Sequence, residues 1–246
     1  RTGDAQQAAE VALQAWREST AEGAAAGFLH PAGDLMVAAL ARLECGDPEG
    51  ARALAAQGRD AAIGQGVAFQ AAWLAMAVAM VDLLMGYADD AQAAFRELAA
   101  TAGRHGFGNV ERLAALGMTE CCALLGDAAG AREWFVRAEA LPHPAPAFAQ
   151  ATTMARAWLA AADGDEREAA RVLREHGVEL AERGEYREAA VLLDEAAMFG
   201  DVGAADTLLG IIGHVDTPVG RARALRAKAV RTGSADDLLA AADGWA

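Results

Sequence analysis

Histidine, cysteine and carboxylate side chains could support catalysis or metal binding, but in this sequence they are scattered. The five histidines occur singly along the 246 residues, and two of them, His30 and His176, are followed at helical spacing by a carboxylate, Asp34 and Glu179. Pro31 and Gly177 directly follow these two histidines, so we predict that neither pair lies within one unbroken helix. A histidine with one carboxylate falls short of a zinc site's three or four ligands. We expect each histidine in a loop or on the surface, and we predict no catalytic or metal-binding residue.

Two short glycine-rich segments, residues 64–66 and 106–108, resemble pieces of a phosphate-binding loop. Neither follows a predicted strand and both lack the third glycine, so helix ends are the better interpretation. The acidic run at residues 163–166 lacks the alternating oxygen ligands of an EF-hand, and we expect a capped helical turn there. The sequence holds no GxxxxGKS or GxxxxGKT motif, so we predict no cofactor, no P-loop and no enzyme in this chain.

Charge and cysteine content narrow the function classes. The formal net charge is −14, the wrong sign for a surface that binds nucleic acid phosphates or an anionic membrane. The three cysteines, Cys45, Cys121 and Cys122, form no CxxC motif and no disulfide framework. Cysteines in such a pattern typically serve as small apolar residues in a protein of a reducing compartment. We therefore expect a cytoplasmic protein with no direct nucleic acid contact.

Two segments allow alternative interpretations. Residues 67–85 are apolar apart from Gln70 and Asp82, but their alanine content and their place in a repeat favour a buried helix over a membrane span. Five cationic residues lie between Arg221 and Arg231. At about 100° per residue they fall on all sides of a helix, whereas a DNA-reading helix presents its cations on one face. We favour a solvated, partly ion-paired helix, and docking to an acidic partner is the alternative.

The elements that must position these residues form a repeat. Glycines expected in turns recur at intervals of 33 to 43 residues: Gly3, Gly46, Gly86, Gly126, Gly164, Gly200 and Gly233. Asp follows five of them and Ser234 follows the last. A glycine can end one helix in a left-handed conformation, and Asp or Ser can cap the next helix by accepting backbone N–H bonds.

Inside each unit the apolar residues keep a fixed register. Alanine stands five residues after the glycine in six units, and a large apolar residue stands nine after it in four units. The small residue lets two helices approach, and the large one fills the groove between hairpins. The pattern predicts an all-α fold, a right-handed α-solenoid of about six to seven TPR-like helical hairpins. We expect residues 1–246 to be a single repeat domain excised from a longer multidomain protein.

The last third of the chain carries a more specific pattern. Residues 158–171 are WLAAADGDEREAAR, followed by Gly200-Asp201, by residues 215–218 (VDTP), by an Arg/Ala helix and by residues 236–242 (DDLLAAA). In this order and spacing, the run resembles the repeat region of large ATP-binding LuxR-family transcriptional regulators of actinobacterial type. The resemblance implies an upstream signal-transducing ATPase and a C-terminal helix-turn-helix DNA reader. Both would lie outside this chain, so ATP is expected only in an absent upstream domain.

A binding surface is expected on the concave face, which the first helix of each hairpin lines in such repeats. Positions thirteen and six before each turn glycine are seven apart and therefore share one helix face. The predicted ligand- or partner-binding residues at these positions are Trp73, Met80, Glu120, Trp158, Arg187 and Asp194. Aromatic and charged side chains on one stripe suit a peptide, a partner helix or a small-molecule inducer. Packing of the two tryptophans between hairpins is the alternative.

These observations predict a signal-input and protein-interaction region of a bacterial LuxR-family regulator. A ligand on the concave face would shift the solenoid, because its curvature sums small rotations at each repeat. The alternative is a generic TPR-like scaffold that binds a partner peptide and has no link to transcription. A homo-oligomer is compatible with either interpretation.

Overall fold

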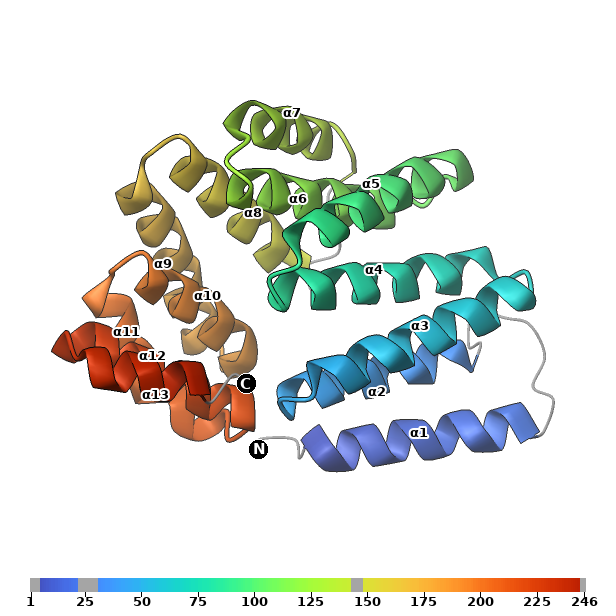
Figure 1. The fold of residues 1–246 in the computed structure, drawn as a ribbon, viewed down its shortest axis with the longest axis horizontal. Coiled ribbons are helices and arrows are strands. Elements are labelled where there is room, and N and C mark those ends of the chain that lie inside the picture. Colours follow the sequence, from blue (N-terminus) through green and yellow to red (C-terminus); the bar gives the residue numbers. More distant parts are fainter. Residues whose placement is uncertain (1–4, 22–30, 143–147, 244–246) are drawn as a thin grey trace.

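The computed structural model describes residues 5–21, 31–142 and 148–243, which form thirteen α-helices (Figure 1). The helices in the first half are α1 (Ala5–Ala21), α2 (Ala32–Glu44), α3 (Pro48–Gly64), α4 (Ala68–Leu84), α5 (Ala88–His105), α6 (Gly108–Leu124) and α7 (Ala128–Glu139). The second half contains α8 (Ala149–Ala162), α9 (Glu166–Glu182), α10 (Tyr186–Met198), α11 (Val202–Ile211), the short 3₁₀ helix η2 (Ile212–His214), α12 (Pro218–Thr232) and α13 (Ala235–Asp243). Successive helices pack as antiparallel hairpins, which confirms the predicted all-α solenoid of TPR-like hairpins.

The predicted helix caps are present. The side chains of Asp47, Asp127, Asp165 and Asp201 each accept a hydrogen bond from the backbone N–H three residues later, at 2.8–3.0 Å. Ser234 accepts the equivalent bond at 3.2 Å. These bonds satisfy N–H groups that have no partner inside the helix and so fix where each second helix begins. The predicted turn at Gly3 and Asp4, with His30 and His143, lies outside the described residues.

Between Gly46 and Gly126 the glycine turns are twice as frequent as the sequence repeat suggests. Left-handed glycines recur every twenty residues, with φ between +71° and +82°, at Gly46, Gly66, Gly86, Gly106 and Gly126. Turns within hairpins and turns between hairpins therefore use the same helix ending. Two of these glycines belong to the glycine-rich segments discussed above, which confirms their interpretation as helix ends.

The conserved spacing of apolar residues inside each unit corresponds to the core. Five of the six alanines that stand five residues after a turn glycine are fully buried: Ala51, Ala91, Ala131, Ala169 and Ala205. One large cluster spans α4 to α8 and centres on Phe95, and a second spans α8 to α12 and centres on Leu173 and Leu193. The two clusters meet at α8, where Ala155 belongs to the first and Ala157 to the second. Among the described residues, no helix combines the length and apolarity needed to cross a membrane.

The prediction for His176 is wrong. Helix α9 is unbroken, so His176 and the carboxylate three residues later share it, and His176 Nδ1 lies 2.7 Å from Thr153 Oγ1 on α8. Gly177 does not end the helix because it is a point of close helix contact. A Cβ at this position would lie 2.8 Å from Leu193 Cγ on α10. The missing side chain lets α9 and α10 approach each other.

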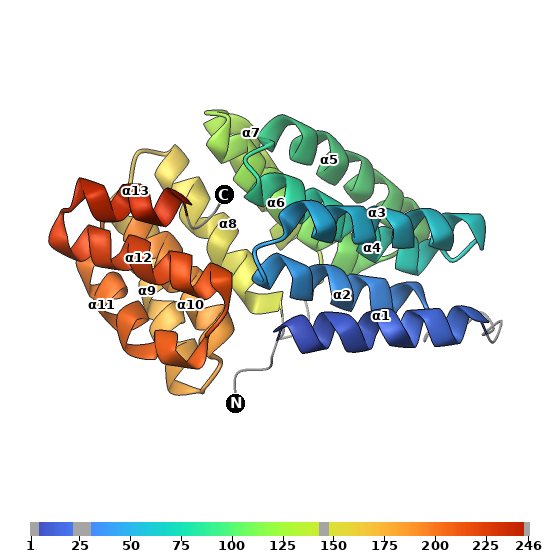
Figure 2. The same ribbon diagram turned by 60° about the horizontal axis from the view of Figure 1, so that its bottom comes forward.

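The hairpins curve until the last ones return to the first. Helices α2, α4, α6, α8, α10 and α12 contact one another in succession, and α12 also contacts α2. Figures 1 and 2 both place the ends of α10 and α12 beside the end of α2. We call this boundary, between α2 on one side and α10, η2 and α12 on the other, the seam. The six helices therefore form the inner wall of a nearly closed ring.

Candidate functional site

Charged side chains connect the two sides of the seam. The Arg187 guanidinium on α10 donates to Glu44 Oε1 at the end of α2, with Nε at 3.1 Å. Arg223 on α12 lies between two carboxylates, 3.9 Å from Glu44 Oε2 and 3.6 Å from Asp194 Oδ2. Arg226 donates a hydrogen bond of 2.8 Å to Asp194 Oδ1. Ion pairs with buried members thus join hairpins that are far apart in the sequence.

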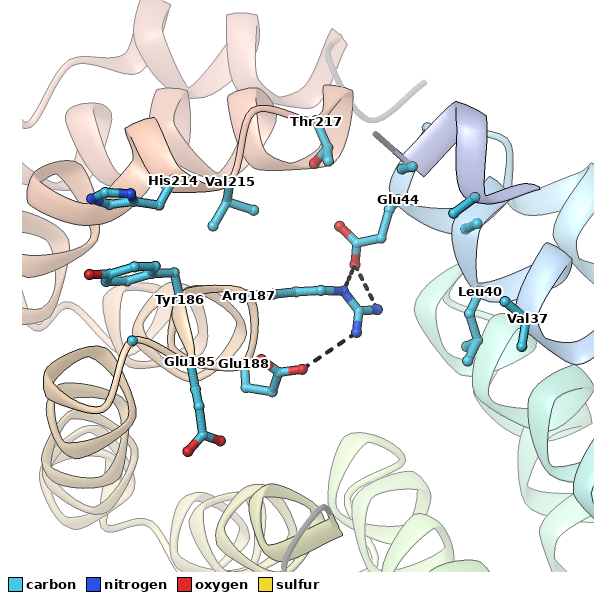
Figure 3. Close-up of a pocket in the computed structure, with 14 residues that line it drawn as sticks. Val37, Leu40, Glu44, Glu185, Tyr186, Arg187, Glu188, His214, Val215 and Thr217 are labelled. Carbon is cyan, nitrogen blue, oxygen red and sulfur yellow. Dashed lines mark hydrogen bonds and ion pairs between the residues drawn. The ribbon is translucent and has the colours of Figure 1, made fainter. Parts of the chain in front are cut away.

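A pocket of about 490 Å³ opens at the seam, and Figure 3 shows its lining. We call it the seam pocket; it is lined by Ala5 and Ala8 of α1, Val37, Leu40, Ala41 and Glu44 of α2, residues 184–188, and His214, Val215 and Thr217. Its volume is within the range of small-ligand pockets, about 300–1,000 Å³. One wall, from α1 and α2, is largely apolar. The other wall, from the start of α10, is largely charged.

The charged wall is organised around Arg187. Figure 3 shows this side chain extending from α10 across the pocket to Glu44, with Glu188 beside it. Arg187 Nη1 lies 3.6 Å from Glu188 Oε1. At the other end of the pocket, the rings of Tyr186 and His214 stack with centroids 4.1 Å apart. The pocket can therefore offer carboxylates, one guanidinium, an aromatic stack and an aliphatic surface to a ligand.

A second acidic feature lies on the inner helices. Glu120 of α6 and Glu195 of α10 lie deep in the molecule and keep only partial solvent exposure. Burial, followed by the Glu195 carboxylate, raises the pKa of Glu120 to about 8. Burial, followed by the Asp194 carboxylate, raises the pKa of Glu195 to about 7, against the opposing effect of Arg226 and Arg223. Near neutral pH Glu120 is thus mostly protonated and Glu195 partly protonated, because burial disfavours the ionised forms and a neighbouring carboxylate adds repulsion.

The predicted aromatic residues lie in contacts between hairpins. Trp73 is half-buried and stacks on Phe148 with centroids 5.3 Å apart. Trp158 makes an edge-to-face contact with Phe199 at 5.3 Å. Such contacts correspond to the packing alternative given above for both tryptophans. Met80 differs, since its side chain is 43% exposed on α4.

The six predicted residues thus do not form one site. Arg187 lines the seam pocket, and Asp194 lies behind it as the buried partner of Arg226 and Arg223. Glu120 lies on α6 and is close enough to Glu195 of α10 for that carboxylate to raise its pKa. The tryptophans and Met80 belong to α8 and α4, helices that contribute no residue to the seam pocket.

Helix α12, which carries the five cationic residues, is less solvated than predicted. Its cations are ion-paired within the chain, as expected, but Arg223 is buried at 7% exposure and is not solvated. The physical reason is the closure of the ring, which brings carboxylates of α2 and α10 against α12. Because the cations of α12 lie on all its sides, some pair with buried carboxylates of α2 and α10 while others pair with carboxylates at the surface.

Sequence reasoning missed Glu44, although a signal was present. Glu44 stands two residues before its turn glycine, where four other units have Leu84, Leu124, Ala162 and Met198 and the last has Arg231. A carboxylate in a position that is apolar in most units indicates a special environment. The predicted stripe, extended to the first hairpin, also gives Leu40, which lines the seam pocket. Within the described ranges, no three His, Cys, Asp or Glu residues are arranged to hold a metal ion.

Comparison with known proteins supports the fold alone. No protein-family model and no curated protein matches this sequence. A solved structure of the Rap conjugation gene regulator of the plasmid pLS20, in complex with the Phr peptide, has a TM-score of 0.58 at 15% identity. The match covers 93% of this chain and 70% of that one. BtubC (BKLC) from P. vanneervenii matches at a TM-score of 0.47 and 12% identity, over 99% of this chain and 91% of that chain.

Proposed function

We propose that this chain is a ligand-sensing repeat region that binds a polypeptide segment in the seam pocket. The observation that carries the proposal is that one pocket is lined by both α2 and α10, which belong to hairpins at opposite ends of the ring. A ligand there would touch both sides of the seam at once. Its binding energy could therefore change how tightly the ring closes.

A polypeptide ligand is favoured over a small inducer by the lining. The aliphatic wall can take apolar side chains, and the charged wall offers donors and acceptors that fix orientation. The structurally similar Rap regulator is in complex with a peptide, which is compatible with a peptide ligand for this fold. A shared fold does not specify a ligand, so the proposal depends on the pocket itself.

We further propose that the region belongs to a regulator of the LuxR type, as the pattern from Trp158 onward suggests. In such a protein the ring would pass ligand binding on to an ATPase and a DNA reader beyond this chain. The test is the flanking coding sequence: a P-loop motif on one side and a helix-turn-helix on the other support it. If the flanks encode neither module, the generic peptide-binding scaffold is the remaining candidate.

Binding itself can be tested with short random peptides displayed on phage and selected against the purified chain. Selected peptides should lose binding to Val37→Trp, because the larger side chain fills the seam pocket from α2. Val37 is 49% exposed, so the substitution should leave the fold intact. Val136→Trp is the matched control, since Val136 is 63% exposed on α7 and lies outside the pocket. Peptides that bind both variants equally well would place the site elsewhere.

A further inference from the structure

The seam pocket is lined by more acidic than basic side chains. Three carboxylates line it, from Glu44, Glu185 and Glu188, against one guanidinium, from Arg187. Glu185 also pairs with Arg183 outside the pocket, at 2.8 Å. Glu44 and Glu188 therefore share Arg187, with N–O distances of 3.1 and 3.6 Å.

The members of this cluster differ sharply in exposure. The Glu44 side chain is 9% exposed, whereas the Arg187 side chain is 49% exposed. Glu44 Oε2 accepts no hydrogen bond in the described structure, and the Arg223 cation is 3.9 Å away from it. A buried carboxylate needs a cation beside it to offset its lost hydration. A half-exposed arginine gains little from its ion pair and is readily rehydrated if it swings out.

We infer that the ligand of the seam pocket presents a lysine or arginine side chain, which takes the place of Arg187 on Glu44 and Glu188. The inference rests on the proposed function, because it names the ligand chemistry of the same pocket. The aliphatic part of such a side chain would lie along Val37 and Leu40, and its charged end would reach the carboxylates. An anionic side chain would instead meet an excess of like charge. Arg187 thus occupies the place of the ligand's cation until the ligand arrives.

Displacement of Arg187 gives the ligand a mechanical effect. The Arg187–Glu44 pair is a direct link between α10 and α2 across the seam. A ligand cation on Glu44 breaks this link and replaces it with contacts to the ligand. Binding is therefore coupled to the closure of the ring through one interchangeable ion pair.

The test uses three acetylated, amidated peptides that share leucine-rich flanks and differ only at a central lysine, norleucine or glutamate. Their affinities for the whole chain are measured by isothermal titration calorimetry. We expect the lysine peptide to bind at least about tenfold more tightly than the norleucine peptide, as good ion pairing with a buried carboxylate provides. Glu44→Gln should remove most of this preference, and Glu188→Gln should reduce it.

The variant Arg187→Ala distinguishes a cationic ligand from an anionic one. If a cation replaces Arg187, the substitution removes a competitor and raises the affinity for the lysine peptide several-fold. If the ligand is anionic, the substitution abolishes binding and the glutamate peptide is the tightest binder of the three, which overturns the inference. Arg132→Ala is the matched control, because Arg132 is a similarly exposed arginine paired with Asp163 away from the pocket.

The remaining outcomes are also distinct. Equal affinity for all three peptides, sensitive to Val37→Trp, rejects the cationic ligand but keeps the peptide-binding function. Absence of binding by these and all selected peptides rejects both. Circular dichroism of each variant shows whether the helical fold is retained. Glu188→Gln provides a second carboxylate variant should Glu44→Gln fail to fold.

Discussion

Arg187 and Glu44 lie 143 residues apart in the chain, yet the Arg187 guanidinium donates a 3.1 Å hydrogen bond to the Glu44 carboxylate. This pair connects the fifth hairpin, α10–α11, to the first, α2–α3, and marks the point at which the solenoid closes on itself. A second link joins α10 to α12 on one side of the seam, where Asp194, two turns further along α10, pairs with Arg223 and Arg226. The two links differ in exposure, so they should differ in energy.

Arg187→Ala should lower the free energy of unfolding by about 1–2 kcal/mol, because the half-exposed arginine is well hydrated when unpaired and Arg223 stays 3.9 Å from the buried Glu44 carboxylate. Asp194→Ala should lower it by about 3–5 kcal/mol, since Asp194 is 3% exposed and its loss leaves Arg223 and Arg226 without its carboxylate. Urea denaturation followed by circular dichroism measures both. Equal losses would show that Arg187 is as structurally important as Asp194, against its role as an interchangeable cation.

The stability of the protein should fall as the pH rises through the neutral range. An unfolded glutamate releases its proton near 4.5, whereas Glu120 in the folded chain keeps its proton up to about 8 and Glu195 up to about 7. Between these values the folded state binds more protons than the unfolded state, so raising the pH favours unfolding. Below about 4.5 both states are protonated, and this stabilising contribution is fully present.

Glu120→Gln tests this pH dependence, because glutamine resembles the protonated carboxyl group and cannot ionise. The variant should match the parent protein near pH 4 and exceed its stability at pH 9 by about 1–3 kcal/mol, allowing for partial solvent exposure. Thermal melts across this pH range provide the measurement. Glu97→Gln, on the exposed surface of α5, should leave the pH dependence unchanged. A parallel pH profile for parent and Glu120→Gln would contradict the assignment.

Arg112 should be essential for the end of α7. Its side chain is fully buried and donates to Ala138 O at 2.6 Å, to Leu141 O at 3.0 Å and to Glu139 Oε1 at 2.6 Å. Arg112→Ala should cost about 3–5 kcal/mol, because it leaves these acceptors without their donor. Arg112→Lys should not restore stability, since an ammonium lacks the planar fork that reaches several acceptors at once. Hydrogen exchange at α7 would show whether the loss is local to this helix.

The local elements of this fold could be predicted from the sequence because they depend on short-range chemistry. A glycine with Asp after it specifies a helix end and a helix start whatever lies elsewhere, as at Gly46 and Asp47. Gly177 shows the limit of the same rule. Its role depends on Leu193 of the next helix, which is why the predicted break in the helix after His176 is wrong and α9 continues through both residues.

The candidate site was less predictable because it forms only when the ring closes. Their spacing of seven residues predicts that Arg187 and Asp194 share one face of α10, but it could not show that Glu44 and Arg223 lie beside them. Whether α2 comes to lie beside α10 and α12 depends on the summed rotation of all the intervening hairpins. A carboxylate at a repeat position that is apolar in four other units was the available signal, and it points to Glu44 without indicating its partner.

Two helical glycines should respond in opposite directions to alanine. At Gly117 of α6 a new Cβ would lie 2.7 Å from the Phe95 ring, which is 1% exposed in the core. Gly117→Ala should therefore lower the free energy of unfolding by about 1–3 kcal/mol through overpacking. At Gly210 of α11 a new Cβ would meet nothing within 4 Å, so Gly210→Ala should raise stability by up to about 1 kcal/mol through helix propensity.

Urea denaturation of both glycine variants, with the parent protein alongside, measures the difference in sign. Gly117→Ala combined with Phe95→Leu offers a further check, because the smaller side chain makes room for the new methyl group. The double variant should then lose less stability than the sum of the two single losses, by about 0.5–3 kcal/mol. Additive losses would mean that α5 and α6 can move apart freely, and that close approach at Gly117 is not what sets the packing of this hairpin.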